Sequence, residues 1–223
     1  MKTLILALLL FVQDPAPPQA PEPPLREEFP PSRTLSPAHD MYEDEFRVPT
    51  PAARTELHRF AACVAERSRD LAVETLRRDF TTARYRNALR SLARNNESCF
   101  RRRSLYASGL PFAGSLAEHL LNRDPAPLNV RLARSADQPA PRPFSATDRV
   151  SLCVVRSVPD DVARLLATEI GSEAESQAVA ALGLAVRVCS QGGPRLVTPA
   201  AGLRAIVATA AFRTLHSAAE AGN

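Results

Sequence analysis

Arginine is the residue type in this chain with the clearest capacity for binding chemistry. The segment from Arg54 to Arg103 contains thirteen arginines against six acidic residues, whereas the segment from Ala146 to Asn223 contains seven of each. The planar guanidinium group matches phosphate and carboxylate geometry through paired hydrogen bonds. Seven arginines in and just beyond one predicted helix form a candidate anion-binding strip: Arg84, Arg86, Arg90, Arg94, Arg101, Arg102 and Arg103. The alternative interpretation is a solvated face in an arginine-rich protein.

The four cysteines have the spacing of two disulfide-bonded units. Cys63 and Cys99 lie 36 positions apart, and Cys153 and Cys189 lie the same 36 positions apart. Four cysteines allow three pairings, and the equal spacing favours Cys63 with Cys99 and Cys153 with Cys189. Disulfides persist in oxidising compartments, so the pattern indicates a protein outside the cytosol. A Cys-x-x-Cys pair, the usual arrangement for thiol oxidoreductases, does not occur in the sequence.

The other reactive residue types do not form the pattern of a known active site. None of the histidines, His39, His58, His119 and His216, lies three or four positions from another histidine or a cysteine, as in a helical zinc site. The sequence has too few glycines for a phosphate cradle and no Gly-x-Ser-x-Gly motif. We therefore expect no metal, no cofactor and no catalytic residues, and an enzyme of undetected type is the third-ranked interpretation.

A shift of 90 residues aligns the second half of the chain with the first. It superimposes both cysteine pairs and further identical residues, among them Val64 on Val154, Asp70 on Asp160, Leu76 on Leu166, Ala88 on Ala178 and Leu92 on Leu182. A shared period with a shared apolar phase indicates an internal duplication. The alternative is chance spacing of four cysteines in a chain rich in alanine and arginine.

The apolar periodicity predicts about four helices in each half. The sequence therefore predicts an all-α fold of two tandem disulfide-stapled helical units after a disordered Pro-rich N-terminal segment. Predicted helices of the first unit are about Thr55–Arg67, a short helix from Asp70, a third with Tyr85, Leu89 and Leu92 on one face, and about Gly114–Asn122. Predicted helices of the second unit are about Thr147–Ser157, a short helix from Pro159, a third from Ser172 to Cys189, and about Pro199–Ala218.

Several helix ends carry recognisable start signals. Ser172 and Glu175 form a capping-box pattern, and Thr81 or Thr82 is expected to cap the corresponding helix of the first unit. Asp70 and Asp160 could be mistaken for a catalytic carboxylate pair. Their position at predicted helix starts suits the positive end of the helix dipole and explains both without a catalytic role.

Composition divides the chain into five segments: 1–13 as a signal peptide, 14–53 as a disordered Pro-rich tether, 54–123 as helical repeat 1, 124–145 as a Pro-rich linker, and 146–223 as helical repeat 2. Met1 and Lys2 precede an apolar run that is too short to span a bilayer, as in a secretory signal. An uncleaved N-terminal anchor is the alternative. Within the linker, Leu128–Leu132 is a candidate strand.

Residue usage suggests the source and the compartment. Arginine occurs 27 times and lysine only once, and alanine and proline are abundant. That usage is typical of a high-GC bacterial genome. We therefore expect an exported protein of the periplasm or the extracellular medium, with no transmembrane span after removal of the signal.

The second unit resembles a group of uncharacterised small exported bacterial proteins with duplicated helical repeats that contain cysteines. The matching residues are Cys153-Val154-Val155-Arg156, Pro159-Asp160-Asp161, Leu165-Leu166-Ala167 and Cys189. The first unit matches only in outline. The resemblance implies export and a helical fold, and it implies no activity.

These observations lead to two hypotheses about function from different classes. In the first, the protein is a non-catalytic binding module whose arginine-rich first repeat holds an anionic envelope lipid, polysaccharide or acidic protein. In the second, it is a structural or scaffolding envelope protein that acts through protein contacts, with apolar faces left over for oligomerisation. Nucleic acid is a poorer partner because no aromatic stacking platform is evident.

Overall fold

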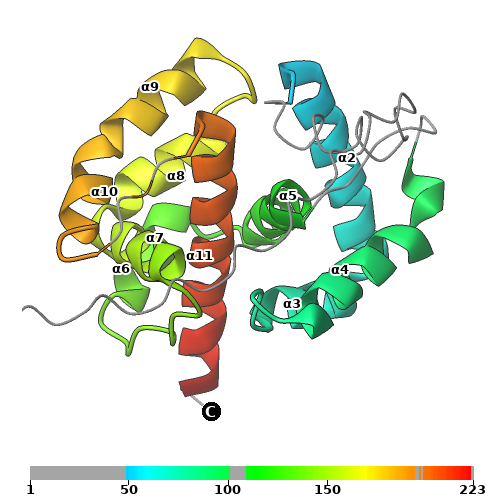
Figure 1. Ribbon diagram of the computed structural model, residues 1–223, viewed down its shortest axis with the longest axis horizontal. Helices are drawn as coiled ribbons and strands as arrows, with labels where there is room; N and C mark the ends of the chain where they lie inside the picture. The colour runs from blue at the N-terminus through cyan, green and yellow to red at the C-terminus, as the bar shows by residue number, and fades with distance from the viewer. Residues whose placement is uncertain (1–48, 101–108, 194–195, 197, 222–223) are drawn as a thin grey trace, which may run out of the picture. The chain divides into compact units, whose positions relative to one another are not determined.

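The computed structural model describes residues 49–100, 109–193, 196 and 198–221. All regular secondary structure in these residues is helical, which confirms the all-α prediction (Figure 1). The helices are α2 (Pro51–Arg67), α3 (Arg69–Arg77), α4 (Ala83–Asn95), the 3-10 turn η1 (Glu97–Cys99), α5 (Gly109–Leu121), α6 (Leu128–Ser135), α7 (Ala146–Ser157), α8 (Pro159–Ala167), α9 (Glu173–Ala181), α10 (Gly183–Cys189) and α11 (Ala200–Ala221). The predicted signal segment, 1–13, and nearly all of the tether, 14–53, lie outside the described residues.

Side-chain caps start several of these helices. The hydroxyl oxygens of Thr50, Thr82, Ser145 and Ser172 each accept a hydrogen bond from the backbone N–H three residues later, which satisfies one of the unpaired donors of the first turn. Thr82 is thus the cap of α4, as one of the two predicted candidates. Thr50 starts α2 at Pro51, four residues earlier than predicted, because proline at the first helical position has no N–H to leave unpaired.

Both predicted disulfides are present. Cys63 is bonded to Cys99 and Cys153 to Cys189, each with a Cα–Cα distance of 5.8 Å. The first bond ties α2 to η1, and the second ties α7 to the end of α10. Two disulfides in a chain of this size indicate an oxidising environment.

The helix bounds repeat at the 90-residue interval that separates the two cysteine pairs. Displacement by 90 residues places α3 on α8 from end to end, the last residue of α2 on the last residue of α7, and the first residue of α4 on the first residue of α9. The internal duplication stays a prediction, and these coincident bounds support it.

The two halves share one hydrophobic core. Residues 47–223 form a single compact unit, and in it α5 packs against α2 and α11, while α11 also packs against α7 (Figure 1). A Cβ on Gly114 would lie 2.6 Å from the Cα of Ala205, so the close approach of α5 to α11 requires glycine there. Phe112 of α5 and Phe212 of α11 are fully buried. The predicted repeats are therefore not separate packing units.

Two local predictions are wrong. Leu128–Leu132 belongs to the helix α6 and is not a strand, because Leu132 and Ser135 face inward at helical spacing and are buried. Arg156 donates hydrogen bonds to the carbonyl oxygens of Ser135, Ala136 and Gln138 and so caps the end of α6. The predicted third helix of the second repeat is divided at Leu182 into α9 and α10.

Candidate anion-binding surface

Three of the predicted arginines form one continuous exposed face on α4. Arg86, Arg90 and Arg94 follow one another at intervals of four residues and are all exposed, while Tyr85, Leu89 and Leu92 bury the opposite side of the helix. Side chains four residues apart are neighbours on a helix, so the three guanidinium groups extend over about 12 Å. We call these three residues the arginine face.

The arginine face is not neutralised by carboxylates within the described part of the chain. Arg86 donates a hydrogen bond to the backbone carbonyl oxygen of Thr81 at 3.0 Å, and no ion pair joins Arg86, Arg90 or Arg94 to another described residue. The long side chains therefore keep their charge available to an outside partner.

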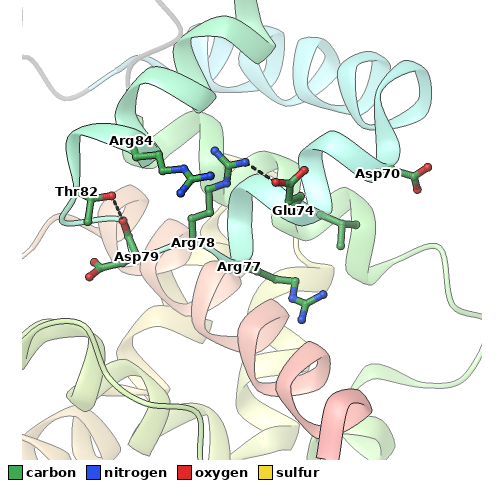
Figure 2. A pocket seen from close by; sticks show the side chains of 8 residues that line it. Asp70, Glu74, Arg77, Arg78, Asp79, Thr82 and Arg84 are labelled. Atoms are coloured by element: carbon green, nitrogen blue, oxygen red, sulfur yellow. Dashed lines mark hydrogen bonds and ion pairs between the residues drawn. The ribbon is translucent and has the colours of Figure 1, made fainter. Parts of the chain in front are cut away.

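Arg84 belongs to a different surface from the other three. It lines a concavity of about 710 Å³ formed by α3 and the start of α4. The other lining residues are Asp70, Val73, Glu74, Arg77, Arg78, Asp79 and Thr82. Figure 2 shows Arg78 extending across this concavity to Glu74, with Arg77 directed away from that pair. Arg84 points away from Arg86, because residues two apart lie on nearly opposite sides of an α-helix.

The charges that line this concavity balance. Three carboxylates and three guanidinium groups line it, so it has no formal excess of either sign. The hydrogen bond from Arg78 lowers the pKa of Glu74 below its usual value, and hydrogen bonds from Thr81 lower the pKa of Asp79. Glu74 and Asp79 are thus ionised at neutral pH. The concavity is consequently a weaker candidate for a polyanion than the arginine face.

The remaining predicted site residues fall outside this surface or outside the described residues. Arg101, Arg102 and Arg103 lie outside the described residues, so their part of the predicted strip is still a prediction. The cysteines form the two disulfides, and the chain has no free thiol.

A buried network of ions joins the two halves and was not predicted from the sequence. Arg204 of α11 donates three hydrogen bonds to Glu118 of α5, at 2.7, 2.9 and 3.1 Å, and one to Glu175 of α9 at 3.2 Å. Arg54 of α2 also donates to Glu175, at 2.8 Å. The side chains of Arg204, Glu118 and Glu175 are at most 5% exposed. The partners are 29 to 121 residues apart, so no local spacing could have revealed them.

The hydrogen bonds around Glu175 explain why its carboxyl stays ionised although it is buried. Burial alone raises the pKa of Glu175, but the hydrogen bonds from Arg54 and from the N–H of Gly171, with the charges of Arg54 and Arg204, lower that pKa to about 2. Gly171 adopts a φ of +79°, and a Cβ there would lie 2.5 Å from Pro51. The start of α2 thus fits directly against the turn before α9.

This network is suited to structure and not to acid–base catalysis. The carboxylates of Glu118 and Glu175 already accept hydrogen bonds from guanidinium groups. His58 lies near Glu118, and burial lowers its pKa, so its ring is neutral at neutral pH. A general base needs a free site within hydrogen-bond reach of substrate, and neither carboxylate provides one.

A second buried pair fixes the segment before α7. Arg213 of α11 binds Asp148 at 2.6 Å, donates to the carbonyl oxygen of Arg142 at 2.7 Å, and places its guanidinium carbon 3.9 Å from the centre of the Phe144 ring. Asp148 also accepts from the N–H of Phe144. The end of the predicted Pro-rich linker is therefore packed onto α11.

Acidification is expected to weaken the fold through Glu175. A carboxyl whose pKa is lower in the folded than in the unfolded chain contributes stability that is present above its ordinary value of 4.5 and is lost as the pH falls toward about 2. Urea unfolding should therefore show a free energy of unfolding that falls across this interval. The fall should be smaller in Glu175→Gln than in the exposed control Glu169→Gln, and equal slopes would contradict the role of Glu175.

The comparisons with known proteins found no match. No family model, no curated protein and no solved structure matches it. Among the residues that the structure describes, no group of three metal-ligating side chains occurs, and no helix is both long and apolar enough to cross a membrane. The described part of the chain is thus helical and disulfide-bonded, with a basic face on α4 that has no carboxylate partner among the described residues.

Proposed function

We propose that this chain is a non-catalytic exported binding protein whose arginine face holds an anionic component of a bacterial envelope. The observation that carries the proposal is the contrast between two sets of arginines. Arg54, Arg204 and Arg213 are paired with carboxylates inside the fold. Arg86, Arg90 and Arg94 stand in one exposed row without such partners among the described residues.

The equivalent face of the second half strengthens this interpretation. Displacement by 90 residues takes Arg86, Arg90 and Arg94 to Ser176, Ala180 and Leu184. The predicted duplication thus aligns the arginine face with three uncharged residues of α9 and α10. The basic row is not needed to build the helix, which supports a role in binding for these side chains.

The arginine face is matched to a partner with several anions in a row. Three guanidinium groups over about 12 Å can engage adjacent phosphates or carboxylates at once. Each basic residue near an anionic surface contributes about 1 kcal/mol, so three together supply roughly 3 kcal/mol. Binding of this kind weakens as salt screens the charges.

The test is co-sedimentation of the protein with lipid vesicles that contain or lack anionic lipid, at low and high salt. Arg86→Gln/Arg90→Gln/Arg94→Gln is expected to lose about a hundredfold in affinity, the equivalent of roughly 3 kcal/mol. The control Arg123→Gln/Arg134→Gln/Arg149→Gln removes the same charge from exposed arginines elsewhere and should bind nearly as the unmodified protein does.

Soluble competitors distinguish the possible sources of the anion. An acidic polysaccharide or an acidic protein, used as a soluble competitor, would release the protein from the vesicles if it is the preferred partner. Equal weakening by both triple variants would contradict a dedicated face and indicate a general effect of net charge. Binding that high salt leaves unchanged would contradict the electrostatic proposal itself.

A scaffolding role is the second candidate, and one observation favours it. Leu184 and Val188 of α10 are 64% and 53% exposed. Large apolar side chains this exposed on neighbouring turns are a feature of contact surfaces between proteins.

A further inference from the structure

The outward side of α9 and α10 is a continuous exposed face. The hydrogen-bond ladder runs through the junction, since the N–H of Leu182 donates to Ala178 and the N–H of Val186 donates to Leu182, at 3.3 and 2.9 Å. Side-chain directions therefore continue with helical spacing from one helix into the next. We call the following exposed residues the α9–α10 outer face: Glu173, Gln177, Ala180, Leu184, Arg187 and Val188.

Half of the residues of this face are aliphatic, and Glu173 and Arg187, near its two ends, carry opposite charges. Ala180, Leu184 and Val188 present aliphatic groups, with Leu184 the most exposed large hydrophobic residue among those described. Glu173 stands at the start of α9, and its carboxylate accepts a hydrogen bond from Gln177 at 3.1 Å. Arg187 stands near the end of α10, without an ion pair in the described part of the chain.

The arrangement is complementary to itself when reversed. Glu173 and Arg187 lie at equal distances in sequence from Ala180. A second copy placed antiparallel about a two-fold axis at Ala180 therefore brings Glu173 of each copy opposite Arg187 of the other. The small side chain of Ala180 allows the two helices to approach at the crossing point, and Leu184 then packs beside Ala180 and Gln177 of the second copy.

We propose that this face binds a second copy of the chain and forms a two-fold symmetric dimer. The proposal goes beyond the anion-binding function and does not depend on it. The contact extends over the seventeen residues from Glu173 to Cys189, which span about 25 Å. One helix pair of this length is smaller than a standard interface of about 800 Å² per partner, so the dimer is a weak, reversible one.

The test is analytical ultracentrifugation of the full chain over a concentration series. The unmodified protein should show a monomer–dimer equilibrium. Leu184→Glu should abolish it, because a carboxylate replaces the central apolar contact, whereas the control Leu71→Glu, at another exposed leucine on α3, should leave it unchanged. Circular dichroism of each variant shows whether the helices are retained.

A charge exchange tests the antiparallel arrangement. Glu173→Arg alone and Arg187→Glu alone should each weaken dimerisation about tenfold, since each change converts two attractive pairs of the symmetric dimer into repulsive ones. The double variant should restore the original constant. A protein that is monomeric at every concentration would overturn the proposal, and so would a double variant no better than the single ones, which would indicate a different occupant of this face.

Discussion

Replacement of Arg204 by methionine is expected to lower the free energy of unfolding by about 3–5 kcal/mol, because it leaves Glu118 buried without its guanidinium partner. Glu175 keeps its contact with Arg54 and so shares less of the loss. Urea unfolding followed by circular dichroism measures the change. This is the largest effect that we expect from a single side chain.

Two controls make this expectation specific to the buried charges. Arg149→Met removes an exposed arginine and should change stability little. The double variant Arg204→Met/Glu118→Gln removes the buried acid together with its partner and leaves the Arg54–Glu175 pair in place. It should recover much of the loss, since an uncharged group does not need a guanidinium partner. An Arg204→Met protein as stable as the Arg149→Met control would contradict the role of the network.

Removal of either disulfide is expected to lower the free energy of unfolding by roughly 4 kcal/mol, through the entropy that a 36-residue loop regains in the unfolded chain. Cys63→Ala/Cys99→Ala and Cys153→Ala/Cys189→Ala should have similar effects because the two loops are of equal length. Denaturant titration of the two variants measures this.

The unfolding curves of the same two variants also test whether the two halves share one core. Since residues 47–223 form one compact unit, each variant should unfold in a single transition that involves both halves. A variant in which one half melts while the other stays folded would contradict this. The unmodified protein, with both bonds intact, is the reference.

The sequence was sufficient where the determining interactions are local. Helix caps such as Thr82 and Ser172 lie within three residues of the N–H groups that they bind, and the apolar period of α4 marks Leu89 and Leu92 as buried. The cysteine spacing likewise predicted both disulfides. In each case the information is contained in a short stretch of chain or in a repeated interval.

The sequence was insufficient where contacts join distant segments. Glu118 and Arg204 are 86 positions apart, and although each lies in an apolar stretch, nothing in either stretch indicates its partner. For the predicted arginine strip, the sequence identified the basic region. It did not show that the arginines of α4 lie on two different surfaces. Arg86, Arg90 and Arg94 share one side of α4, whereas Arg84 lines the concavity beside α3.

The dependence of α5 on α11 has a consequence for synthesis on the ribosome. All other described helices are complete before Ala200–Ala221 is made, yet α11 supplies Arg204 and the surface on which α5 packs. Until then the nascent chain holds Glu118 without its cation and leaves uncovered the part of α5 that packs against α11. Folding of the core must therefore wait for the last helix. We expect a chain truncated before Ala200 to be degraded by proteases and not to form a smaller functional protein.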